Sequence, residues 1–220
     1  VQFAPSATIE DYPEIDLFGY MKTMAKDDNA RGGASTRSAV ARLSNAISLE
    51  PYQGELEFLT NMGLAKRQNL DNGIAQSEIH RSYYAYTISV DLDRVGIDGE
   101  INVSNEEKAK RVKTLLETVQ YLYRDIRGRR ENLSPLFIIG GNYERKNPFF
   151  ENIVKIDNNM INVNALAEMK ESNEDLEKST IVGVTSGIFN NDSQIKEKLG
   201  AVTIAEAFGE FKKKVDEYYA

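Results

Sequence analysis

The feature that most constrains the fold is a pair of alternating segments separated by a long polar stretch. Residues 39–48 and residues 83–93 alternate apolar and polar side chains, which is the two-residue period of a half-buried strand. Residues 55–59 give a weaker strand signal, and residues 60–78 form a long polar and basic loop. We therefore predict a sheet with a protruding hairpin, and we expect such a hairpin to contact a binding partner.

The rest of the chain contains helical periods and two further buried strands. Residues 11–25 predict a short helix, residues 104–128 a long one that stops at Gly128, and residues 203–218 a final amphipathic one. Ser104 with Glu107, and Thr203 with Glu206, have the spacing of a capping box. Residues 135–140 and 181–185 predict buried strands, and residues 27–35 a flexible loop.

This order of elements predicts an α+β fold. An antiparallel sheet backed by two main helices is the economical packing, of the ferredoxin-like or RRM-like kind. With 220 residues and 41% hydrophobic residues, we expect a single domain over residues 1–220, with a variable insertion at about residues 151–178.

Composition excludes several classes of function. The chain has no cysteine, so disulfides, thiol nucleophiles and thiolate metal sites are excluded. No apolar run approaches the roughly 20 residues that cross a bilayer, and we expect a cytoplasmic protein with no membrane partner. The net charge of −7 disfavours bulk attraction to nucleic acid but leaves room for a local basic groove. No motif indicates a cofactor or a metal, and the single histidine cannot form a metal site.

Arg42 and Ser44 lie on the polar face of the first predicted strand, about 7 Å apart. A guanidinium and a hydroxyl at that spacing suit the phosphates of a nucleic-acid backbone. The alternative is an ordinary solvated face of a sheet. Asp91 and Asp93 share a side of the later strand, where Arg94 offers a pairing partner, so we interpret them as a solvated strand end rather than a Mg²⁺ site.

The loop at residues 60–78 combines cations with a few apolar side chains. Lys66 and Arg67 suit phosphates, whereas Met62, Leu64, Leu70 and Ile74 suit wedges between bases. Long loops inside a compact domain are usually functional or disordered, and a disordered surface loop is the alternative here.

Three further features have two interpretations each. Gly140, Gly141, Asn142 and Arg145 follow a strand and suit close approach of a phosphate, or a plain strand-end turn. His80 suits acid–base chemistry, or a structural or RNA-contacting role at the root of the hairpin. Basic residues cluster near the end of the second predicted helix, where we favour a helix-dipole role over nucleic-acid contact. These are Arg124, Arg127, Arg129 and Arg130.

Five segments in a fixed order resemble the DevR family, the CRISPR-associated backbone subunits of type I-B Cascade complexes. They are Asp16-Leu-Phe-Gly-Tyr-Met21, Arg42-Leu-Ser-Asn-Ala-Ile-Ser48, Glu50-Pro-Tyr-Gln-Gly-Glu55, His80-Arg-Ser-Tyr-Tyr-Ala-Tyr86 and Asp91-Leu-Asp-Arg-Val-Gly96. The resemblance covers roughly residues 10–150.

The resemblance implies a modified RRM palm, a helical insertion and a thumb hairpin at residues 60–78. Family members assemble head-to-tail along a guide RNA, which pairs with target DNA, beside other Cascade subunits. The implied RNA contacts are Arg42, Ser44, Asn45, Lys66, Arg67, His80, Arg81 and the loop Gly140–Arg145. A first palm strand normally precedes the helix at Asp11, and we expect it to be missing from this chain.

Three functions follow from this interpretation. The first is a non-enzymatic guide-RNA scaffold in antiviral defence. The second is an RNA endonuclease that cuts target RNA from the thumb loop, with Asp71 as the acidic residue. The third is a regulatory or purely interacting protein with no RNA ligand.

Overall fold

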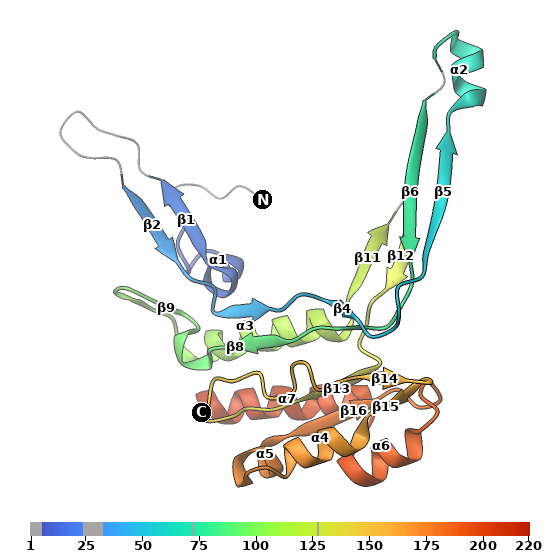
Figure 1. Cartoon of the computed structure of the whole chain (residues 1–220). Coiled ribbons are helices and arrows are strands. Elements are labelled where there is room, and N and C mark those ends of the chain that lie inside the picture. Colours follow the sequence, from blue (N-terminus) through green and yellow to red (C-terminus); the bar gives the residue numbers. More distant parts are fainter. Residues whose placement is uncertain (1–5, 24–32, 72, 127) are drawn as a thin grey trace, which may run out of the picture. The chain divides into compact units, whose positions relative to one another are not determined.

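A computed structural model of the chain describes residues 6–23, 33–71, 73–126 and 128–220 (Figure 1). The chain is a mixed α+β protein with small antiparallel sheets, consistent with the RRM-like prediction. It divides into two compact units. The first unit comprises the segments before Asn45 and after Tyr86, and the second is Asn45–Tyr86. This division does not test the single-domain prediction, which stays a prediction.

The first unit holds most of the elements. In chain order they are α1 (Pro13–Phe18), β1 (Tyr20–Thr23), β2 (Ala34–Arg37), β3 (Ala41–Leu43), β8 (Ile88–Val90), the 3-10 turn η1 (Leu92–Arg94), β9 (Ile97–Asp98), β10 (Ile101–Asn102), α3 (Asn105–Gln120), β11 (Tyr123–Ile126), β12 (Arg129–Asn132), β13 (Phe137–Gly140), β14 (Ile156–Asp157), β15 (Met160–Ile161), α4 (Val163–Lys170), α5 (Glu174–Ser179), β16 (Ile181–Val184), α6 (Asp192–Leu199) and α7 (Ile204–Tyr219).

Strands of the first unit pair in twos within the described ranges, all of them antiparallel: β1 with β2, β3 with β8, β9 with β10, β11 with β12, β13 with β16, and β14 with β15. The predicted strands at residues 135–140 and 181–185 are thus confirmed as β13 and β16. Helix α7 packs on β16 and against α3. The predicted insertion at residues 151–178 holds β14, β15, α4 and most of α5.

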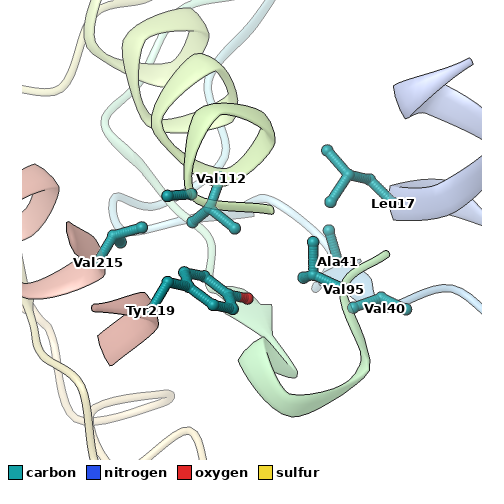
Figure 2. Packing of buried hydrophobic residues seen from close by; sticks show 8 residues of the cluster. Leu17, Val40, Ala41, Val95, Val112, Val215 and Tyr219 are labelled. Atoms are coloured by element: carbon teal, nitrogen blue, oxygen red, sulfur yellow. The ribbon is translucent and has the colours of Figure 1, made fainter. Parts of the chain in front are cut away.

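The core of the first unit joins both long helices to β3. Val112 of α3 and Val215 and Tyr219 of α7 lie in one buried cluster with Ala41 of β3 and Leu17 of α1 (Figure 2). Burial of a large aliphatic or aromatic side chain stabilises a fold by about 1.5–3 kcal/mol. The residues around β3 are therefore held by a buried apolar cluster of the unit.

The capping residues of both long helices were predicted correctly. The Ser104 hydroxyl accepts a hydrogen bond from Glu107 N at 3.3 Å, and Thr203 and Glu206 form a reciprocal capping box. The predicted end of the first of these helices at Gly128 is wrong. Helix α3 ends at Gln120, and β11 and β12 follow as a hairpin whose turn contains Gly128 with φ 77°. The predicted helix was too long because apolar residues continue at helical spacing into β11.

The predicted helix at residues 11–25 is also too long. It ends at Phe18, because Gly19 has φ 74° and a Cβ there would lie 2.3 Å from Arg37 O. Residues 20–23 instead pair with residues 34–37 as β1 and β2. The loop predicted at residues 27–35 lies outside the described residues up to position 32, and Ser35 belongs to β2.

The two long strands that we predicted are each interrupted in the structure. Residues 39–48 split into β3 and β4 (Ile47–Ser48), and residues 83–93 split into β7 (Tyr84–Ala85), β8 and η1. The Ser44 hydroxyl accepts a hydrogen bond from Thr87 N at 2.9 Å, and Ser44 N donates to Thr87 O at 2.9 Å. A hydrogen bond to a side chain thus takes the place of one backbone–backbone hydrogen bond where the strand pairing is interrupted.

The second unit is a long hairpin on a short base. Strands β5 (Gly54–Thr60) and β6 (Ile74–His80) pair over seven residues each, with helix α2 (Met62–Gln68) between them, and β4 pairs with β7. The predicted hairpin and the strand at residues 55–59 are confirmed. The prediction of a loop throughout residues 60–78 is wrong, since this segment contains α2 and most of β6.

Candidate functional site

Arg42 lies on β3 with its side chain half-exposed. Its Nη2 atom is 2.9 Å from Oδ2 of Asp91, a carboxylate that is almost fully buried. Arg94 Nη1 approaches the same oxygen at 3.7 Å. Asp91 therefore orients two guanidinium groups at one edge of the β3–β8 pair. The pairing of Asp91 with Arg94 was predicted, but the interpretation as a solvated strand end is wrong for Asp91, because its carboxylate is almost fully buried.

The glycine loop after β13 is tied to α5. A Cβ at Gly141 would lie 2.3 Å from Ser179 O, so the backbone here packs directly against the end of α5. The Tyr143 hydroxyl bonds the Thr180 hydroxyl at 3.0 Å, and burial is the main cause that raises the pKa of Tyr143 to about 12. Glu144 N donates to Asp175 Oδ2 at 3.2 Å. This backbone amide thus holds the Asp175 carboxylate of α5, and the predicted approach of a phosphate to the loop stays a prediction.

Lys146, which follows the glycine loop, pairs with η1. Its Nζ atom lies 2.6 Å from Asp93 Oδ1, and Asp93 is two residues after Asp91, whose carboxylate holds Arg42. We call Arg42, Asp91, Asp93, Arg94 and Lys146 the η1 cluster. It contains three cations and two carboxylates, so its net charge is +1 in a chain of −7.

Arg94 and Lys146 were not among the predicted contacts. Lys146 follows directly on the predicted Arg145, and Arg94 had been assigned to charge pairing, so sequence spacing alone did not mark either as part of a site. Asn142 and Arg145 are exposed on the same loop as Lys146. In the first unit, ion pairs link the predicted Arg42 to Asp91 and the unpredicted Lys146 to Asp93, while the RNA contacts of the glycine loop stay a prediction.

The remaining predicted contacts belong to the second unit. Lys66 and Arg67 lie in the last turn of α2, where Arg67 Nε donates to Gly63 O at 3.1 Å. The helix ends at Asn69, which has φ 53°, and Asp71 is exposed in the turn that follows. Asn61 Oδ1 accepts from Gly73 N at 2.6 Å and closes the tip.

The tip of this hairpin exposes many large apolar side chains. Phe58 is 68% exposed and Ile74 is 70% exposed. The other exposed members are Leu56, Leu59, Met62, Leu64 and Leu70. An apolar hairpin with so little burial of its own is typical of a segment that contacts a partner. Lys66 and Arg67 add positive charge to the same tip.

His80 lies at the base of the hairpin between two tyrosines. Its ring stacks on Tyr52 with 5.2 Å between centroids, and its Nδ1 atom hydrogen-bonds the Tyr84 hydroxyl. These contacts favour the structural interpretation of His80 over an acid–base role. Arg81 follows it and is exposed, while Asn45 begins the second unit beside Ser44.

Across residues 6–23, 33–71, 73–126 and 128–220, histidine and carboxylate side chains do not gather into a group of three that would hold a metal ion. Among the helices of those ranges, none is both long enough and apolar enough to cross a bilayer.

Comparison with known proteins relates this geometry to a family. No match was found among curated proteins. Residues 2–165 match the family model described as CRISPR-associated negative auto-regulator DevR/Csa2, and this range includes both the η1 cluster and the hairpin. The match spans more than half of the 220 residues. The chain therefore belongs to the CRISPR-associated DevR/Csa2 family.

Proposed function

We propose that this chain is a guide-RNA-binding backbone subunit of a type I-B Cascade complex. In this role, copies of the chain line up along the guide beside other Cascade subunits. The guide stays available for pairing with target DNA in antiviral defence. The observation that carries the proposal is the hairpin of β5 and β6, whose tip combines exposed apolar side chains with Lys66 and Arg67.

The hairpin suits a single strand of RNA for physical reasons. Apolar side chains at a tip can separate neighbouring bases, and cations beside them can meet the phosphates on either side. Contacts of this kind read the backbone rather than the base edges, which leaves those edges available for pairing.

The η1 cluster supplies the second part of the proposal. Asp91 and Asp93 hold Arg42 and Lys146 in place, so these cations are already ordered before a phosphate arrives. Pre-ordered cations lose less conformational entropy on binding. Because the chain carries a net charge of −7, we expect RNA affinity to depend on this narrow positive region and to fall steeply with salt.

The proposal includes no catalytic step and a cytoplasmic location. The alternative, cleavage of RNA by Asp71, has support from the exposed position of Asp71 beside α2. The description of the family as a negative auto-regulator supports a second alternative, in which the chain binds no RNA. Both alternatives are outcomes of the test that follows.

The test measures binding of a labelled guide-length RNA to the intact chain across a salt series. We expect binding of the native chain at low salt, and weaker binding by Arg42→Ala and by Lys66→Ala/Arg67→Ala. Loss of two phosphate contacts should make the slope of log K against log salt shallower by about 1.4. Lys178→Ala/Lys213→Ala is the matched control, because it also removes two exposed helical cations.

The condition of the RNA distinguishes the alternatives. Intact RNA with both the native chain and Asp71→Asn supports the scaffold. Cleavage that disappears in Asp71→Asn would establish the endonuclease. Absence of any RNA binding at low salt would contradict the scaffold and favour the regulatory alternative.

A further inference from the structure

The hairpin of β11 and β12 has a composition that the proposed function does not use. Over residues 121–132 the chain carries four arginines against Asp125 and Glu131, a local net charge of +2 in a chain of −7. Nearly every described residue of β11 and β12 is exposed. A local concentration of arginine on an exposed ribbon in an acidic protein is a specific feature rather than an effect of composition.

The two faces of this ribbon carry different groups. Tyr123 and Asp125 share a face with Arg130, whose guanidinium lies 4.5 Å from the centroid of the Tyr123 ring. Asp125 orients the same guanidinium through contacts of 3.0 and 3.3 Å. The result is an ordered stack of an arginine on a tyrosine at the surface.

The opposite face presents Arg124 and Arg129. Register places Arg124 across from Glu131 and Arg129 across from Ile126. Considering only the described residues, neither Arg124 nor Arg129 forms an ion pair. Tyr121, 64% exposed just before β11, adds a further ring. Leu133 N bonds Leu122 O at 2.8 Å and closes the base, so these groups sit on a fixed ribbon.

We propose that the β11–β12 hairpin is a second nucleic-acid contact, which binds a single strand other than the one held at the η1 cluster and the β5–β6 hairpin. Exposed tyrosine rings and arginine planes stack on bases, and arginines meet phosphates, without recognising a sequence. An acidic peptide would satisfy the arginines but would leave the exposed rings without a role. Calling this contact the second one rests on the proposed function, whereas nucleic-acid binding by the β11–β12 hairpin does not, because it concerns different residues.

The first experiment measures binding of labelled oligo(dT) and oligo(U) to the intact chain over a salt series. The variant Arg124→Ala/Arg129→Ala leaves the Arg130, Tyr123 and Asp125 contacts in place. We expect it to make the slope of log K against log salt shallower by about 1.4, whereas Lys178→Ala/Lys213→Ala leaves affinity and slope near the native values. The two oligonucleotides show whether the strand is DNA, RNA or either.

A second readout reports on stacking. The chain has no tryptophan, so Tyr121→Trp introduces a single tryptophan beside the ribbon. We expect its emission to be quenched on addition of oligonucleotide, and Tyr121→Leu to weaken binding roughly fivefold or more. A native slope in the double arginine variant, or unchanged Trp emission at saturating oligonucleotide, would overturn the proposal.

A third arm separates this inference from the proposed function. One molar equivalent of unlabelled guide-length RNA is first bound to the chain, and labelled oligo(dT) with no complementarity is then added. We expect both strands to bind together. Displacement of one by the other would overturn a second contact. If Arg42→Ala leaves guide binding unchanged while Arg124→Ala/Arg129→Ala abolishes oligo(dT) binding, the proposed function fails and the inference stands.

Discussion

Asp16 and Arg37 form a fully buried ion pair, with 2.5 Å between Asp16 Oδ1 and Arg37 Nη2. Asp16 Oδ2 also accepts from Arg111 Nη1 at 3.0 Å and from Gly96 N at 2.8 Å. One carboxylate therefore connects α1, β2, the start of β9 and α3. The arginines also reach backbone carbonyls, since Arg37 Nη1 donates to Ile97 O at 2.5 Å and Arg111 Nη1 to Ile9 O at 2.7 Å.

We predict that Asp16→Asn is strongly destabilising. The substitution keeps the shape of the side chain but leaves two buried guanidiniums without their shared counter-charge, which costs about 3–5 kcal/mol. Asp98→Asn is the matched control, because Asp98 is 3.6 Å from Arg37 and 27% exposed, and its loss should cost about 1 kcal/mol. Denaturant midpoints measure both. Equal effects of the two variants would show that the buried carboxylate is not a special connection.

Two neighbouring glycines give a second, steric prediction. A Cβ at Gly141 would collide with Ser179 O, whereas a Cβ at Gly140 meets nothing within 4 Å. Gly141→Ala should therefore lower the free energy of unfolding by about 1–3 kcal/mol, as overpacking does. Gly140→Ala should be close to neutral. Thermal unfolding of both variants tests this, and a harmless Gly141→Ala would mean that the glycine loop does not pack on α5 as described.

Tyr219 gives a prediction about alkaline pH. Its hydroxyl donates to Leu92 O at 2.6 Å, and burial is the main cause that raises the pKa of Tyr219 above its usual 10.0. A raised pKa means that the folded state holds its proton longer than the unfolded state. The stability it contributes is therefore complete below pH 10.0 and is lost as pH rises further.

Tyr219→Phe should accordingly be less stable than the native chain at neutral pH, by about 1 kcal/mol for the lost hydrogen bond. Above pH 10.0 the difference should shrink, because the phenylalanine variant has no hydroxyl to ionise there. Some alkaline loss should remain in the variant, since the pKa of Tyr143 is also raised. Urea unfolding at neutral and alkaline pH measures the difference, and a constant difference would argue against this linkage.

Elements whose structure depends on neighbouring residues were predicted well from the sequence. The caps at Ser104 and Thr203 and the individual strands β5, β13 and β16 all follow from neighbouring residues. The end of α3 was missed because Tyr123 and Ile126 continue a helical spacing by coincidence, and only pairing with residues 129–132 makes them a strand.

Long-range contacts explain the other failures. The break in the strand at residues 83–93 depends on the Ser44 hydroxyl, which lies 43 residues from Thr87. The hydrogen bond from Arg111 to Asp16 joins residues that are 95 positions apart in the sequence. At the site, the ion pairs Arg42–Asp91 and Lys146–Asp93 join residues 49 and 53 positions apart, so spacing along the sequence does not reveal them.

The most direct test of the central claim is the number of chains bound to RNAs of increasing length, measured by native mass spectrometry at low salt. If the chain is a guide-RNA scaffold, the number of copies should rise in regular steps with RNA length while the RNA stays intact, and Lys66→Ala/Arg67→Ala should load fewer copies. A single copy on RNAs of every length, or no loading at all, would contradict the account.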